Sequence, residues 1–249
     1  PAGHGGGFLM DCPRPLAQSL ADKLGFYKLR AKVTVENISD SMGVLAAWDG
    51  EPAIKPDLAF ADPRSDKLGW RILVPGDLKQ KVADLIGADL VESDAYEAHR
   101  IAFGVPRGGL DFMYSDAFPH EANMDRLHGV DFDKGCYVGQ EVVSRMQHRG
   151  TVRTRIVRVV LDDFSPETGI AVLAGDKPVG TMGSTADGKG LALVRTRLQG
   201  DGELGHGDGG FTAPVVQSQR GAEGLRRRFL GERRPGMMRP VNSSTMRTW

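Results

Sequence analysis

The stretch KGCYVGQEVVSRMQHRGTVRTRIVRVVL, residues 134–161, changes its character halfway along. Its first part has apolar residues at helical spacing and predicts a helix that starts at Gln140 or Glu141. Gly150 is placed to end that helix, because glycine readily adopts the left-handed conformation of a C-terminal cap. The β-branched residues at 151–161 then predict a strand. This switch indicates an α+β chain with a domain boundary near residue 150.

Short β segments follow this predicted strand. They lie at 170–174, 178–182 and 191–195, between turns that contain glycine. Strands of this length and spacing are typical of a small β-barrel or sandwich. The apolar positions of the first strand change parity along its length, so we also expect a β-bulge near residues 156–157.

The part of the chain before residue 150 mixes helices and strands. Leu16, Leu20 and Leu24 recur every fourth residue and predict the buried stripe of a first helix, which Gly25 would end. The other expected strands lie at 8–11, 32–36, 44–48, 58–61 and 70–74, and 32–36 is expected to pair with 44–48 as a hairpin. A helix is expected after Asp77, ending before Gly87, with one buried face formed by Leu78, Val82, Leu85 and Ile86. Another helix is expected to start at Asp94. This order is typical of an α+β fold with split strand–helix–strand units.

Composition narrows the class of protein. The chain has 249 residues, 40% of them apolar, and a formal net charge of +0, which gives no reason to expect nucleic acid or an acidic membrane as a partner. It has two cysteines, too few for a disulfide framework and without the spacing of a zinc site, so we expect no metal site. A reduced, cytoplasm-like compartment fits this usage, and we expect Cys12 to be a small buried hydrophobe.

The segment 196–249 differs from the rest of the chain. It has nine arginines, no lysine and five acidic residues, a net charge of +4, whereas residues 1–195 carry 23 basic and 27 acidic side chains, a net charge of −4. Three interpretations stay open: a disordered tail, a frameshifted reading of GC-rich coding sequence, and an RNA- or phosphate-binding arm. The start at Pro1, without a methionine, is expected of a fragment or a processed chain.

Cys136 lies directly before the predicted helix at 140–150. A helix N-terminus and a nearby cation such as Lys134 both favour a thiolate, so the thiol is a candidate reactive or ligand-contacting group. Gly135 and Gly139 allow close approach of the backbone on either side. The alternative is a buried structural thiol, which does not explain the flanking glycines and cations.

The same segment resembles a known signature. Lys134-Gly-Cys-Tyr-Val-Gly-Gln-Glu141, followed by Arg145 and Arg149-Gly150, closely resembles the motif of the YgfZ-type folate-binding proteins, relatives of the glycine-cleavage T-protein that include mitochondrial iron–sulfur assembly factors. Further blocks that look like this family are Phe26-Tyr-Lys-Leu-Arg-Ala-Lys32, Asp62-Pro-Arg64, Gly69-Trp-Arg71, Arg100-Ile with Gly104-Val-Pro106, and Phe118-Pro-His-Glu-Ala-Asn123.

The resemblance implies a T-protein-like domain over residues 1–150, truncated at its N-terminus, and a partial β-barrel over 151–195. It implies tetrahydrofolate or a related reduced folate as the cofactor, and iron–sulfur client or assembly proteins as partners, including radical tRNA-modifying enzymes. Cys136 carries over as the signature thiol, acting in the chemistry of the site. The residues that carry over as folate-binding are Asn123, Lys134, Gly135, Tyr137, Gly139, Gln140, Glu141, Arg145 and Arg149.

Reduced folates have a pterin with N–H donors and an acidic glutamate tail. Glu141 can accept from the pterin, and the guanidinium of Arg145 or Arg149 suits the carboxylates of the tail. The expected protein is a monomer in the cytoplasm, or in the mitochondrial matrix if the source is eukaryotic, with no membrane partner and no direct RNA binding. The alternative functions are a tetrahydrofolate-dependent aminomethyl or one-carbon transferase, and RNA binding through the segment 196–249.

Overall fold

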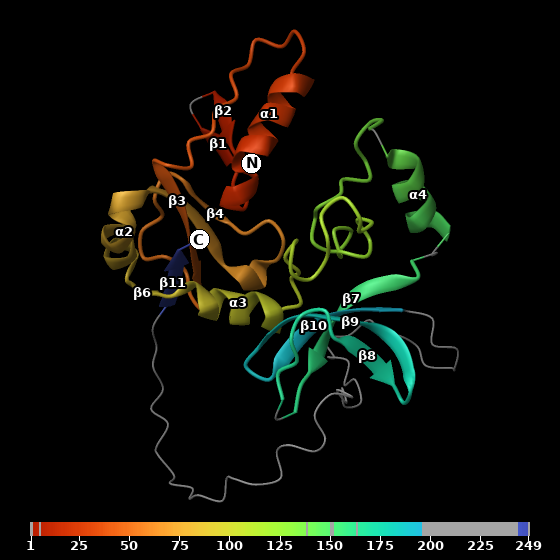
Figure 1. Ribbon diagram of the computed structural model, residues 1–249. Coiled ribbons are helices and arrows are strands. Elements are labelled where there is room, and N and C mark those ends of the chain that lie inside the picture. The colour runs from red at the N-terminus through yellow and green to blue at the C-terminus, as the bar shows by residue number, and fades with distance from the viewer. Residues whose placement is uncertain are drawn as a thin grey trace, which may run out of the picture. The chain divides into compact units, whose positions relative to one another are not determined.

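The computed structural model describes residues 2–4, 6–137, 139–149, 152–162, 164–195 and 244–248. The chain forms two compact units (Figure 1). Unit 1 comprises Pro1–Tyr96 with Asn242–Trp249, and unit 2 comprises Glu97–Val241. Both contain helices and strands, which confirms the mixed α/β character predicted from the sequence. The units divide between Tyr96 and Glu97, whereas residue 150, where the sequence changes character, lies within unit 2.

Unit 1 is built on a five-stranded sheet with the strand order β4-β5-β3-β11-β6. Its strands are β3 (Met42–Trp48), β4 (Ala59–Ala61), β5 (Trp70–Pro75), β6 (Ala88–Val91) and β11 (Ser244–Thr248). The other elements of the unit are the β1 (Ala2–His4) and β2 (Gly7–Leu9) pair, α1 (Ala17–Tyr27), α2 (Lys79–Ile86), the start of α3 (Ser93–Ala102), and 3-10 turns at Arg14–Leu16, Asp66–Leu68 and Gly76–Leu78. Strand β11 runs antiparallel to β3 and parallel to β6.

Strand β3 is the centre of unit 1 because both of its faces are buried. Leu45 and Ala47 pack with Ile72 of β5 and the buried side of α2. On the other face, Ala46 and Trp48 pack with Tyr96. A strand covered on both sides is expected to be a continuous apolar run, as VLAAW is, rather than an alternating one.

Several predicted elements agree with the structure. The expected strands at 44–48, 58–61 and 70–74 correspond to β3, β4 and β5, and the expected strand at 8–11 overlaps β2. Helix α2 ends at Gly87, whose φ of 73° is the left-handed cap that the sequence predicts. Helix α3 begins at Ser93, one residue before the predicted Asp94.

Other predictions about unit 1 are wrong. Residues 32–36 form no strand, and β3 pairs instead with β5 and β11, because local β propensity does not create a ladder without a partner. Helix α1 continues through Gly25 to Tyr27, and it has no buried residue, so its leucine stripe is not a core stripe. In the α2 region, Leu78 and Leu85 are exposed while Ile86 is buried.

A buried ion cluster sits beside the sheet of unit 1. The guanidinium of Arg64 donates two hydrogen bonds to the Asp62 carboxylate, at 3.0 and 2.7 Å, and one to the Tyr96 hydroxyl at 2.7 Å. Arg71 also pairs with Asp62, at 3.4 Å, and with Asp11. Burial alone would raise the pKa of Asp62, but the hydrogen bonds and charge of Arg64 outweigh it and lower the pKa. The Asp62-Pro63-Arg64 segment is therefore a turn with a structural ion pair.

The β part of unit 2 is a four-stranded antiparallel sheet with the order β7-β10-β9-β8. Its strands are β7 (Thr154–Val160), β8 (Ala171–Ala174), β9 (Lys177–Ala186) and β10 (Lys189–Arg195), and α4 (Gln140–Arg149) precedes them (Figure 1). These strands confirm the four β segments predicted from the sequence. Asp187 and Gly188, with φ of 49° and 70°, form the two-residue turn between β9 and β10.

The predicted β-bulge is misplaced. Strand β7 pairs with β10 in continuous register from Thr154 to Val160, and the register shifts lie in β9 and its partners, between Gly190 and Ala192 and between Val172 and Leu173. Apolar positions of both parities in β7 are explained by burial on both faces. Val159 packs with Val172 and Met182, while Ile156 packs with Ile101 and Leu191.

The predictions about the segment 196–249 concern mostly residues 196–243 and 249, which lie outside the described residues. Residues 244–248 form β11, a strand that the sequence did not predict. In the part of the chain that the structure describes, no helix has both the length and the apolar character needed to cross a membrane.

Candidate functional site

Helix α4 and the loop before it carry most of the predicted site residues. The helix starts at Gln140, as predicted, and Gly139 before it has a φ of 87°, a left-handed conformation that favours glycine. The loop is joined to the first helical turn by two hydrogen bonds. Tyr137 N donates to Gln140 Oε1 at 3.4 Å, and Gln140 N donates to the Tyr137 carbonyl at 3.2 Å.

The Cys136 thiol is exposed in this loop. The Lys134 ammonium lies 4.3 Å from the centre of the Tyr137 ring. This cation–π contact joins a side chain before the thiol to one after it. Gly135 is also exposed, with nothing near the position of a Cβ. The exposure contradicts the alternative of a buried structural thiol and leaves Cys136 accessible to a reagent or ligand.

Cys12 has a different environment. It is half-buried, and burial followed by the negative charge of Asp11 raises the pKa of its thiol. We expect iodoacetamide at pH 7.5 to alkylate Cys136 faster than Cys12, by roughly fivefold or more, because the thiolate is the nucleophile and exposure sets its access. Peptide mass spectrometry over time gives both rates from one sample. In urea the two rates should converge, and equal rates in the folded protein would contradict the assignment.

Glu141 and Arg145 are on the solvent side of α4. Arg145 donates to Glu141 at 2.6 Å, the pair predicted from their four-residue spacing. Their side chains are 56% and 83% exposed, so this pair contributes only about 0.3–0.5 kcal/mol and exchanges partners readily. Val143 is buried on the opposite side of the helix. The side chain of Arg149 lies outside the described part of the chain.

Asn123 is placed away from solvent, where its amide has structural partners. Its φ of 58° is left-handed, a conformation that asparagine tolerates. Its Nδ2 donates to the Ile156 carbonyl at 2.8 Å, and its Oδ1 accepts from Arg155 at 3.0 Å. Arg155 also forms a bidentate pair with Asp125, at 2.9 and 3.0 Å. Both ends of the Asn123 amide are thus engaged in holding this segment against β7, and its role in folate binding stays a prediction.

His120 is a residue of this region that the sequence analysis did not select. It is 1% exposed, and its Nε2 lies 3.0 Å from Oε1 of Gln147 in α4. The signal that could have found it is its place in the Phe118–Asn123 block. Among the residues that the structure describes, no group of three or more His, Cys, Asp or Glu side chains could hold a metal ion.

Arg100 is the centre of a second polar network in unit 2; the sequence analysis named it in a family-like block but did not select it as a site residue. Its side chain is 1% exposed, and its five N–H donors make five hydrogen bonds. Two go to Glu97, one to the Val105 carbonyl at 3.0 Å, one to Asp111 at 2.8 Å and one to Ser184 at 2.9 Å. With every donor engaged, this arginine is a structural residue that joins α3 to β9.

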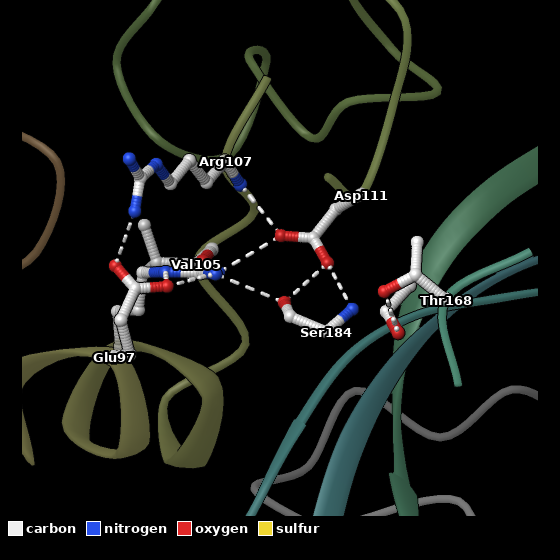
Figure 2. A network of polar contacts seen from close by, with 8 residues as sticks. Glu97, Val105, Arg107, Asp111, Thr168 and Ser184 are labelled. Carbon is white, nitrogen blue, oxygen red and sulfur yellow. Dashed lines mark hydrogen bonds and ion pairs between the residues drawn. The ribbon is translucent and has the colours of Figure 1, made fainter. Parts of the chain in front are cut away.

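The surrounding residues complete the network (Figure 2). Asp111 accepts from the Arg107 backbone N–H at 2.7 Å and from the Ser184 backbone N–H at 2.7 Å. Arg107 also pairs with Glu97 at 2.9 Å. A Cβ on Gly183 would collide with the Asp111 carboxylate, so glycine is required there. The predicted site residues and this network belong to the same unit, and the network supports the fold rather than the chemistry.

A protein-family match and the similar curated proteins agree on the class of protein that this chain resembles. Residues 153–214 match the family described as CAF17, C-terminal beta-barrel domain. The chain is 35% identical over 224 residues to the mitochondrial iron-sulfur cluster assembly factor IBA57 homolog of Pyricularia oryzae, which covers 79% of this chain and 57% of that protein. It is 32% identical over 204 residues to human mitochondrial IBA57, covering 76% and 56%. The chain thus spans about half the length of these curated relatives.

Proposed function

We propose that this chain, as a relative of the CAF17/IBA57-type iron–sulfur cluster assembly factors, supports the assembly or maintenance of iron–sulfur proteins. The observation that carries the proposal is the exposed Cys136 in its signature loop, directly before α4. The names of the relatives support the class of function. These names are IBA57 and not YgfZ. They support the resemblance at the level of the wider family to which both kinds of protein are related.

We further propose a reduced folate, tetrahydrofolate or a related form, as the cofactor bound beside Cys136. The chemistry of α4 supports it: Glu141 offers a carboxylate acceptor for pterin N–H groups, and Arg145 offers a guanidinium for the carboxylates of the tail. The two side chains pair with each other at the surface, and such a weak pair is readily exchanged for ligand groups. Tyr137, half-buried beside the thiol, offers an aromatic face to a planar ring.

The partners in this proposal are iron–sulfur client or assembly proteins, including radical tRNA-modifying enzymes, met by a monomer. The relatives are named as mitochondrial, and the proposed compartment is accordingly the mitochondrial matrix if the source is eukaryotic. The proposal needs no direct RNA binding and no membrane partner.

Anaerobic titration of the purified chain with tetrahydrofolate tests the cofactor. We expect saturable binding by the wild type and by Cys136→Ala, since the thiol is not needed for capture. Glu141→Gln is expected to bind about tenfold more weakly, because a charge-assisted hydrogen bond is replaced by a neutral one. Glu167→Gln is the matched control, an exposed glutamate of the same unit outside α4, and should bind as the wild type does.

Two outcomes would change the conclusion. A folded wild type that does not bind tetrahydrofolate would remove the cofactor from the proposal. Formation of methylene-tetrahydrofolate from an aminomethyl donor would favour the one-carbon transferase instead. The assembly role has its own test in a strain that lacks the gene: if Cys136→Ser fully restores cluster-dependent enzymes, the thiol has no part in that role.

A further inference from the structure

The segment that carries Cys136 has mostly local polar contacts. Within 131–149, the described side chains and backbone of the loop bond to neighbours in the chain, as Asp133 N does to Asp131 and Tyr137 N to Gln140. Among the described residues, one hydrogen bond joins this segment to a distant part of unit 2, and it lies between His120 Nε2 and Gln147 Oε1. The position of the loop and helix therefore depends strongly on that contact and on the buried Val143.

The imidazole of His120 touches the segment on both sides of the thiol. Its ring centre lies 6.0 Å from that of Phe132, four residues before Cys136, and its Nε2 contacts Gln147, in the third turn of α4. The signature loop lies between these two points in the chain. A single buried side chain thus restrains where the loop begins and where the helix after it lies.

His120 is itself held on a rigid support. The turn at 118–123 is closed by a hydrogen bond from Phe118 N to the Glu121 carboxylate at 3.0 Å. The Glu121 carbonyl accepts from Ile156 N at 3.0 Å, and the Asn123 amide donates to the Ile156 carbonyl at 2.8 Å. The last two bonds are made to Ile156 of β7 and fix the turn to the sheet. His120 therefore has a fixed position relative to the sheet, and its contact with Gln147 restrains α4 relative to the same sheet.

The choice of histidine here is not explained by packing. Because Gln147 presents Oε1, the proton is assigned to Nε2, and Nδ1 is then a buried acceptor with no partner among the described residues. A buried unpaired nitrogen costs stability that an apolar side chain of similar volume would not. Histidine provides a directed N–H toward α4, which a leucine would lack.

We propose that His120 is a positioning residue: its imidazole, held against β7, fixes α4 through Gln147 and thereby sets the presentation of Cys136. The need for a fixed position of Cys136 rests on the proposed function, but the restraint of α4 by His120 does not. It is measured on the full chain without folate or a cluster, so a failure of either proposal is distinguishable from a failure of the other.

The test compares His120→Gln with His120→Asn by amide hydrogen exchange and by Cys136 alkylation. Glutamine carries an amide N–H about as far from the backbone as Nε2, whereas the shorter asparagine places it near Nδ1. We expect His120→Asn to speed exchange at residues 140–147 and to change the Cys136 alkylation rate, each by about two- to tenfold, the effect of losing one net hydrogen bond. His120→Gln should stay near the wild type, and the amides of β7, β9 and β10 should be unchanged in both.

Gln147→Ala removes the other partner at an exposed position, where loss of folding is not expected. It should reproduce the His120→Asn effect, and the double variant should add nothing further. His148→Asn, an exposed neighbour on α4, is the control and should leave both rates unchanged. The proposal is overturned if His120→Asn leaves α4 exchange unchanged, if it speeds the sheet amides equally, or if His120→Gln is as impaired as His120→Asn.

Discussion

Replacing Arg100 with Met is expected to destabilise unit 2 by about 3–5 kcal/mol, because it leaves the carboxylates of Glu97 and Asp111 without their buried partner. Arg100 and Asp111 are each 1% exposed at the side chain, so water cannot take the place of the lost donors. The measurement is urea-dependent hydrogen exchange of the β7, β9 and β10 amides. Unit 2 contains no tryptophan, which makes exchange a better probe of it than fluorescence.

Arg145→Met is the matched control. Its ion pair with Glu141 has the same 2.6 Å distance as the shortest contact of Arg100 with Glu97, but both partners are more than half exposed. We expect its removal to cost about 0.5 kcal/mol or less. Equal effects of the two substitutions would show that burial does not set the value of these arginines, and the structural role of the Arg100 network would then be wrong.

Replacing Gly69 with Ala is expected to destabilise unit 1 by about 3–5 kcal/mol, from backbone strain and overpacking together. Gly69 has φ 73° and ψ −130°, a conformation that favours glycine. A Cβ there would collide with the Ala47 carbonyl and lie 2.9 Å from the Trp48 Cα. Neither obstacle is a movable side chain, since both belong to the backbone of the central strand β3. Urea unfolding followed by tryptophan fluorescence measures it, with Trp249→Phe as background so that Trp48 and Trp70 report.

Gly87→Ala separates strain from collision. Gly87 has the same φ of 73°, but nothing lies within 4 Å of its would-be Cβ. Its substitution should cost about 1–2 kcal/mol, the penalty of the left-handed conformation alone. If Gly69→Ala costs no more than Gly87→Ala, the close approach of Gly69 to β3 is not a constraint on this fold.

Where the sequence predicted local structure correctly, the cause was local as well. The cap at Gly87, the start of α4, the strands β3, β4 and β5 and the four strands of unit 2 follow from spacing, propensity and turn residues that act within a few positions. The predictions that failed needed a distant partner. The alternating residues 32–36 have no strand to pair with, and the leucine stripe of α1 is not covered, so neither pattern produces the buried element it suggests.

The candidate site divides in the same way. The sequence by itself identified the thiol, the glycines beside it and the Glu141–Arg145 pair, because these lie in one contiguous segment with a specific order. Only the tertiary structure decided that Cys136 is exposed, that the Asn123 amide is engaged with β7, and that His120 contacts α4. Only it showed that Arg100 has all of its donors paired, with partners up to 84 positions away. The physical reason is that burial and hydrogen bonding depend on which distant segments meet, and a single buried donor or charge is stable only where such partners are brought to it.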